Sequence, residues 1–72
     1  MCRMKNVSGF EWESIHDGKL PPIDEEVVFS SGIREFIGYM DPDMDIWECK
    51  ENDDIEYHSN ISDGYITHFR YY

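Results

Sequence analysis

Short runs of β-branched and aromatic residues, separated by turn-forming residues, are the feature that most limits how this chain can fold. No stretch of ten or more residues carries apolar side chains at the period of an α-helix. Strands are predicted at residues 10–15, 25–29, 33–40, 45–49 and 65–72, with a brief edge segment at 55–57. We therefore expect an all-β fold, or a β-rich fold with one short helix. The expected form is a small antiparallel meander or half-open barrel of about five short strands.

Turn signals mark the ends of these runs. They fall at residues 16–19, 20–22, 30–32, 41–43 and 62–64, which are rich in Gly, Pro, Asp and Ser. Gly38 is different, because it lies inside the predicted strand at 33–40. A glycine within a strand indicates either a β-bulge or a close approach of another backbone.

The chain of 72 residues is long enough for one domain, which we place at residues 10–72 behind a flexible leader at residues 1–9. A domain of this size has a small core, so each large side chain matters. We predict that Trp12 belongs to that core, beside Phe10 in the first strand. Trp47 could face either way, and burial is favoured because a small core needs its tryptophans.

Acidic residues dominate the charge of the chain. Sixteen acidic and six basic residues give a formal net charge of −10. This charge repels nucleic acid and anionic membranes, and a protein that binds nucleic acid directly is expected to be basic. We therefore predict no direct nucleic-acid or membrane binding. A partner with a basic surface is the expected counterpart.

Half of the acidic residues lie in one stretch, residues 41–56, which has a single basic residue, Lys50. Apolar side chains are set among these charges, so the stretch is predicted to be folded. In an extended segment, side chains two residues apart are about 6.6 Å apart. We therefore expect Asp41, Asp43 and Asp45, followed by Glu48, to present a row of carboxylates. The predicted partner-binding residues are Asp41, Asp43, Asp45, Trp47, Glu48, Glu51, Asp53, Asp54, Glu56 and Tyr57.

The same aspartates also match positions 1, 3 and 5 of a calcium-binding EF-hand loop. Ile46 stands where that loop needs glycine, and Asn52 stands where it needs glutamate. No helical pattern flanks the loop either. We therefore predict no dedicated metal site, and interpret the loop as a solvated acidic turn.

No catalytic or zinc-binding pattern is present. The histidines and cysteines lack the C-x₂-C and H-x₃-H spacings of zinc sites: His16, His58, His68, Cys2 and Cys49. Neighbouring acidic residues should weaken the Cys49 thiolate as a nucleophile. We expect no enzymatic activity and no cofactor. We interpret both cysteines as reduced thiols of a cytoplasmic protein, because the chain has neither a hydrophobic signal core nor an apolar run near 18 residues.

The order of several short motifs resembles a known group of proteins. The motifs are Trp12, Leu20-Pro21, Glu26-Val27, Gly38-Tyr39, Trp47 and Thr67-His68-Phe69. Over residues 10–69 this order is similar to that of a family of small uncharacterised phage and prophage proteins. The resemblance implies a phage or prophage origin and a compact β-rich domain. Thr67 and His68 match the most recognisable dipeptide of the family, and we expect them to have a structural role in closing the sheet. The chain departs from the family at its end, where residues 69–72 replace a proline-rich segment.

The sequence predicts two alternative functions. The first is a small acidic phage-type protein that binds and inhibits a host protein with a basic, nucleic-acid-binding surface, by nucleic-acid mimicry in the manner of an anti-defence inhibitor. The alternative is a structural or self-associating β module of a phage assembly, which would use a strand edge and the Tyr71-Tyr72 pair. A third interpretation is that the charge serves solubility alone.

Overall fold

One open sheet forms the framework of the molecule. The computed structural model describes residues 11–71, and these form six strands that pair antiparallel. The strands are β1 (Glu13–Ser14), β2 (Val27–Ser30), β3 (Glu35–Met40), β4 (Asp45–Cys49), β5 (Ile55–Asn60) and β6 (His68–Arg70). Within the same residues the helical elements are single 3₁₀ turns, η2 (Ile15–Asp17), η3 (Glu51–Asp53) and η4 (Ile61–Asp63). The all-β prediction is confirmed, and no helix in this region is long and apolar enough to cross a membrane.

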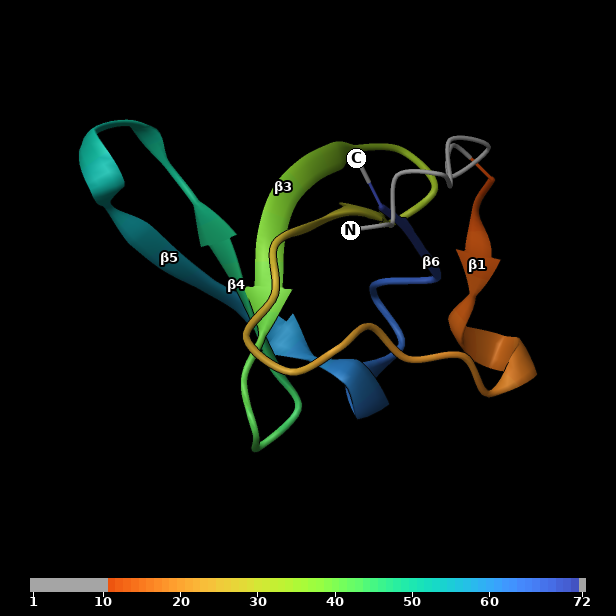
Figure 1. Ribbon diagram of the computed structural model, residues 1–72. Helices are drawn as coiled ribbons and strands as arrows, with labels where there is room; N and C mark the ends of the chain where they lie inside the picture. Colours follow the sequence, from red (N-terminus) through yellow and green to blue (C-terminus); the bar gives the residue numbers. More distant parts are fainter. Residues whose placement is uncertain (1–10, 72) are drawn as a thin grey trace.

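The strands are not arranged in simple chain order. β2 to β5 form a meander, and the chain then returns so that β6 lies between β1 and β2, giving the order β1-β6-β2-β3-β4-β5. β5 is therefore an edge strand, and it runs to Asn60 rather than ending at the predicted residue 57. Figure 1 shows the β4–β5 hairpin extending away from the rest of the sheet, with η3 at its tip.

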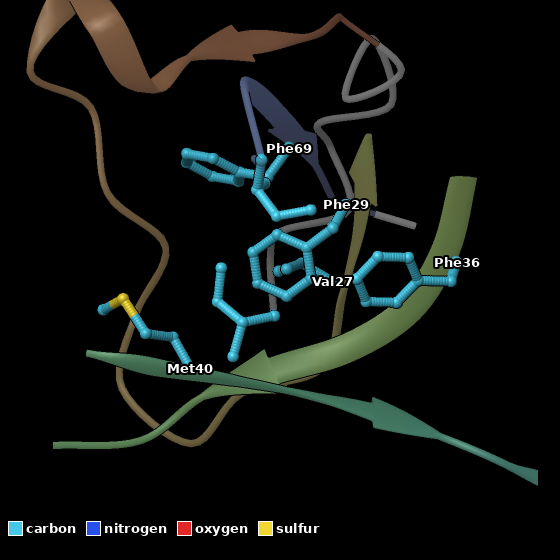
Figure 2. Close-up of a cluster of buried hydrophobic side chains, with 7 residues drawn as sticks. Val27, Phe29, Phe36, Met40 and Phe69 are labelled. Atoms are coloured by element: carbon cyan, nitrogen blue, oxygen red, sulfur yellow. The ribbon is translucent and has the colours of Figure 1, made fainter. Parts of the chain in front are cut away.

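The core lies on one face of the sheet, which we call the inner face. It consists of Val27, Phe29, Phe36, Met40, Ile46, Ile66 and Phe69 (Figure 2). Phe29 is paired with Phe36 on β3 and with Phe69 on β6, so the middle of the sheet brings three aromatic rings together. The side chains that alternate with these point to the opposite side, which we call the outer face.

Gly38 lies on the inner face between two core residues of β3. A Cβ atom at this position would overlap the backbone carbonyl oxygen of Trp47 on β4. The second interpretation of the glycine, a close approach of another backbone, is therefore confirmed. It allows β3 and β4 to lie closer together than any side chain at position 38 would permit.

The β-bulge lies elsewhere, between β4 and β5. Ile46 is paired with Ser59, whereas the next residue, Trp47, is paired with Tyr57, so His58 is an extra residue in β5. Its ring stacks on that of Phe36, with 4.9 Å between the ring centroids. The bulge thus turns a polar side chain of the edge strand onto the rim of the core.

Thr67 and His68 have a structural role, because they join neighbouring elements of the sheet, although the sheet as a whole stays open. The Thr67 amide donates to the carbonyl oxygen of Ser30 on β2 at 2.9 Å, and the Thr67 carbonyl accepts from the Ile15 amide at 2.9 Å. The Thr67 hydroxyl also lies 2.9 Å from Nδ1 of His68. These contacts join η2, β2 and β6 at one place.

The prediction for Trp12 is wrong. Its side chain is 39% exposed, and the Arg70 guanidinium carbon lies 5.3 Å from its ring centroid. The reason is its position, because it precedes β1, which among residues 11–71 pairs with β6 alone. The other predictions for the N-terminal region, a leader at residues 1–9 and Phe10 in the core, lie outside the described residues.

Candidate partner-binding face

Asp41 organises the turn that joins β3 to β4. Its Oδ1 accepts hydrogen bonds from the amides of Asp43 and Asp45, both at 2.9 Å, and its Oδ2 accepts one from Trp47 Nε1 at 3.0 Å. The backbone closes the same turn, because the Met44 amide donates to the Asp41 carbonyl at 2.8 Å. An aspartate that bonds backbone amides just ahead of it is a common turn-forming device. Asp41 is therefore a structural residue.

The predicted row of carboxylates is wrong. Oxygen atoms of Asp41, Asp43 and Asp45 lie within 4.8 Å of one another, because the chain turns between them instead of running extended. Such a group could in principle hold a cation. Both oxygens of Asp41, however, already accept hydrogen bonds from the protein. We interpret the group as part of the turn and call it the turn acids.

Asp45 connects β4 to the edge strand. Its Oδ1 accepts a hydrogen bond from Asn60 Nδ2 at 2.9 Å and one from the Tyr57 hydroxyl at 3.3 Å. Asn60 also caps η4, since its side chain accepts from the Ser62 amide while its own amide donates to Asp63. Asn60 thus links Asp45 to the start of η4.

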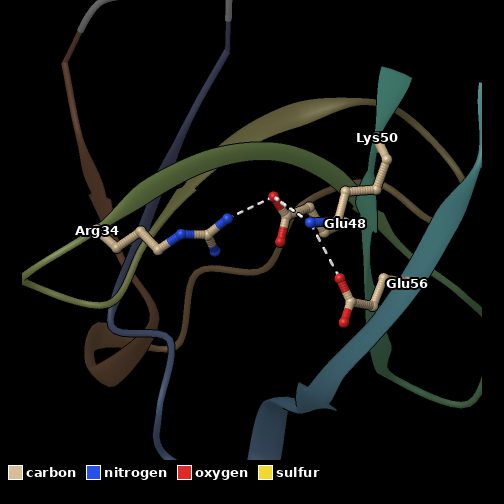
Figure 3. Close-up of polar contacts among 4 residues, drawn as sticks. All are labelled: Arg34, Glu48, Lys50 and Glu56. Atoms are coloured by element: carbon tan, nitrogen blue, oxygen red, sulfur yellow. Dashed lines mark hydrogen bonds and ion pairs between the residues drawn. The ribbon is translucent and has the colours of Figure 1, made fainter. Parts of the chain in front are cut away.

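Glu48 and Glu56 are paired with basic side chains of the same chain (Figure 3). Glu48 accepts a hydrogen bond from Arg34 at 2.5 Å, and Lys50 lies 3.0 Å from Glu56 and 3.9 Å from Glu48. The bond from Arg34 lowers the pKa of the Glu48 carboxyl, which is only 13% exposed. Part of the charge predicted for partner binding is therefore neutralised within the protein.

An aromatic row crosses the outer face. Tyr39 on β3 is paired with Trp47 on β4, and Trp47 is paired with Tyr57 on β5. The Trp47 and Tyr57 rings meet edge to face, with 5.3 Å between centroids. Trp47 is half-buried, whereas Tyr57 is 48% exposed. We call these three residues the outer aromatic row.

A cavity of about 500 Å³ opens on the outer face at the end of β4. Its apolar wall consists of Tyr39, Cys49 and Ile55, which come from three adjacent strands. Its acidic residues are Asp24, Glu26, Asp53 and Asp54. Because the turn acids lie at the start of β4 and the cavity lies at its end, the outer aromatic row, which crosses the middle of β4, has acidic groups on both sides.

The structure separates the ten predicted partner-binding residues into two groups. Those that are exposed are Asp43, Glu51, Asp53, Asp54, Glu56 and Tyr57. Those that are half-buried are Asp41, Asp45, Trp47 and Glu48. Sequence reasoning missed Asp24, Glu26 and Tyr39, which lie outside the acidic stretch. No local pattern singles them out, since only the pairing of β3 with β4, and of the segment at 23–28 with β3, brings them to this face.

The hydrogen bonds to Asp41 make a pH-dependent contribution to stability. The bond from Trp47, followed by those from the Asp45 and Asp43 amides, lowers the pKa of the Asp41 carboxyl, while burial opposes this. A folded-state pKa below the unfolded one means that the contribution is present above the unfolded value of about 3.9. It is lost as the pH falls through the folded value.

We therefore expect Asp41→Asn to lower the free energy of unfolding at pH 7, and this loss to shrink towards pH 2. Urea unfolding of the variant and the parent protein at both pH values measures the difference. Asp43→Asn is the matched control, because that exposed carboxylate belongs to the same turn. Equal losses in the two variants would show that Asp41 has no special role.

Comparisons with known proteins give no match that indicates a function. No protein-family model matches this chain, and no curated protein or solved structure does either. The resemblance to phage proteins therefore stays a prediction from the motifs.

Proposed function

We propose that this protein binds another protein through the latter's basic, nucleic-acid-binding surface and blocks it. The observation that supports this most directly is the outer aromatic row, which has acidic groups on both sides. Aromatic side chains at the centre of a contact supply much of the binding energy of protein interfaces. Acidic groups around them select a partner of opposite charge.

The overall charge strengthens the preference for a basic partner. A net charge of −10 on a domain this small attracts a basic surface over distances of the order of the Debye length, about 8–10 Å at physiological salt. It raises the association rate and makes binding sensitive to salt. The same charge opposes direct contact with nucleic acid, whose phosphates are also negative.

Inhibition does not require the carboxylates to copy the spacing of phosphates. The turn acids are clustered, and a second group of acids, Asp24, Glu26, Asp53 and Asp54, lines the cavity, so the face offers two separate negative regions rather than a regular row. A face of this kind would cover a basic surface and exclude nucleic acid by occupying it. If the chain is of phage origin, as its motifs imply, a host nuclease is a natural target.

Capture from a host lysate at about 0.05 M and 0.5 M salt tests the proposal. We expect a basic nucleic-acid-binding protein to be retained at low salt, released at high salt and displaced by added duplex DNA. The double variant Asp43→Lys/Asp54→Lys, with one exposed acid from each side of the row, should lose this capture. Glu11→Lys/Asp17→Lys changes the net charge by the same amount at exposed positions outside the face, and should retain most of it.

Two outcomes would contradict the proposal. One is retention of acidic or neutral proteins only, or retention that salt does not affect. The other is equal loss of capture in the two double variants, which would mean that net charge acts without a defined face.

Self-association is a second candidate function, and the position of β5 favours it. This six-residue strand is at the edge of the sheet, and two of its side chains, Ile55 and Tyr57, are about half exposed. An edge strand can pair with another copy of itself. A stable oligomer that survives about 0.5 M salt would support this candidate, since salt does little to screen an apolar contact. A monomer at micromolar concentration would contradict it.

A further inference from the structure

The sheet has an open edge at β5. Within residues 11–71 this six-residue strand pairs with β4 alone, so its other side has no strand partner there. Figure 1 shows the β4–β5 hairpin extending away from the rest of the sheet, and residues 55–57 of the strand are exposed. An open, exposed edge of this kind can accept an added strand from another chain.

The register of the hairpin shows which backbone groups face the open side. The Lys50 amide donates to the Asp54 carbonyl oxygen at 2.7 Å, so the backbone of Asp54 faces β4. In an antiparallel pair, residues that bond across the pair alternate with residues that do not. The backbone of Glu56 therefore faces β4 as well, whereas the amides and carbonyls of Ile55 and Tyr57 face the open edge.

The side chains of the same two residues give this edge an apolar side. Ile55 is 50% exposed and Tyr57 is 48% exposed, and both side chains lie on the outer face. The side chain of Glu56, between them, points to the opposite face, where it lies 3.0 Å from Lys50. A strand added at this edge would therefore place every second side chain beside Ile55 and Tyr57, and apolar side chains suit those positions.

The charge of the hairpin indicates which kind of strand fits the edge. Residues 45–60 hold six acidic residues and one basic residue. Two of these acids are paired with basic side chains (Figure 3), whereas Glu51, Asp53 and Asp54 at the exposed tip form no ion pair within residues 11–71. A basic strand would be attracted to this hairpin. A second copy of the hairpin would bring the same negative charge to the edge, and like charges on paired strands are destabilising.

We infer that the open edge of β5 receives an extended basic segment of the partner as an additional strand, an inference that rests on the proposed function. The backbone of Ile55 and Tyr57 would exchange hydrogen bonds with this segment. Its apolar residues would extend the outer aromatic row, and the lysine or arginine residues that alternate with them would be attracted by the acidic tip. In this mode of recognition the backbone bonds supply affinity and the side chains supply specificity.

The test uses the full-length protein and a blocked peptide of the same length as β5 that alternates lysine and valine. Amide hydrogen exchange followed by NMR is the measurement. We expect saturating peptide to slow exchange of the Ile55 and Tyr57 amides at least several-fold, because both would become hydrogen-bonded. The Glu56 amide already faces β4 and should change little.

Two control peptides separate strand pairing from attraction by charge. The same lysine–valine peptide with methylated backbone nitrogens keeps its charge but cannot pair as a strand, so it should not protect the two amides. A peptide that alternates glutamate and valine keeps the ability to pair but has the wrong charge, and it should not protect them either. Equal protection by either control would overturn the inference. So would protection that rises with protein concentration in the absence of peptide, because a second copy would then occupy the edge.

Variants of Ile55 place the contact on β5. Ile55→Pro removes an amide that faces the open edge without removing a bond to β4, and it should abolish protection of the Tyr57 amide by the lysine–valine peptide. Ile55→Val keeps the amide and should retain the protection. If Ile55→Pro is folded by circular dichroism and its Tyr57 amide is still protected, the inference is wrong. If that variant is unfolded, the two control peptides decide the question on the parent protein.

The failure of this inference is distinguishable from failure of the proposed function. If the protein captures a basic partner in a salt-sensitive way but the lysine–valine peptide leaves the Ile55 and Tyr57 amides unprotected, the edge has no such role and the proposed function stands. If the peptide protects these amides but no basic partner is captured, the proposed function fails while the edge remains an acceptor for basic strands.

Discussion

Replacing Gly38 with alanine is expected to remove a large share of the stability of this protein. The new methyl group would overlap the carbonyl oxygen of Trp47, and it would also lie 3.3 Å from the Phe36 ring. Both neighbours are fixed, one by the β3–β4 pairing and the other by the core. We expect a loss of about 3 kcal/mol or more in the free energy of unfolding, the upper end for overpacked sites. A domain of this length has roughly 4–11 kcal/mol in total.

Urea unfolding followed by circular dichroism measures this loss. Gly32→Ala provides the matched control, because Gly32 has a positive φ of 97° but no other atom lies within 4 Å of the place that its new Cβ would occupy. Alanine there should cost only the strain of a left-handed backbone, about 1–2 kcal/mol. If Gly38→Ala cost no more than this control, the close approach of β3 and β4 would not be a rigid feature of the fold.

The local part of the fold can be predicted from the sequence. Turn residues and alternating apolar residues predict β4 with its correct ends and place β2 and β3 within two residues of their observed starts. The position of β6 between β1 and β2 cannot be predicted in this way. It depends on pairing between residues about 40 positions apart, such as Phe29 and Phe69. The alternation of apolar and polar residues along one strand does not say which other strand it pairs with.

Errors in the predicted site have a similar physical cause. The Asp-Pro-Asp segment at 41–43 does end a strand as predicted, yet its aspartates do not form the expected extended row. An aspartate at the start of a turn bonds the amide two residues ahead, as Asp41 does with Asp43, and this signal is present in the sequence. Asp24 and Glu26 carry no such signal, because their approach to Cys49 and Asp54 arises only in the folded sheet.

Trp47 is predicted from the sequence to be either a core residue or an interface anchor, and the structure places it between the two. Its ring lies on the outer face, yet its Nε1 donates to Asp41 and its ring meets that of Tyr57 edge to face. Trp47→Ala should therefore weaken both the turn and any contact made by this face. Such a variant cannot separate folding from binding, so the test of the anchor must use Tyr57.

Tyr57→Ala is expected to lower affinity for the basic partner roughly 30-fold or more while leaving the protein folded, as for a hot-spot residue. Tyr57 is 48% exposed at the end of the outer aromatic row and lies on an edge strand, so the sheet does not need its ring. Tyr57→Phe removes only the 3.3 Å hydrogen bond to Asp45 and should retain most of the affinity.

Tyr65→Ala is the matched control, because that tyrosine is 66% exposed and lies outside the outer aromatic row and the strands. Titration calorimetry against the captured partner gives the affinities, and circular dichroism shows whether each variant is folded. If the Tyr57 ring anchors the interface, only Tyr57→Ala lowers the affinity for the partner. If any exposed aromatic ring contributes equally, Tyr57→Ala and Tyr65→Ala lower the affinity by the same amount. If Tyr57→Ala is folded and binds as tightly as Tyr65→Ala, the outer aromatic row is not where the partner docks, and contact through another face becomes the better explanation of the capture.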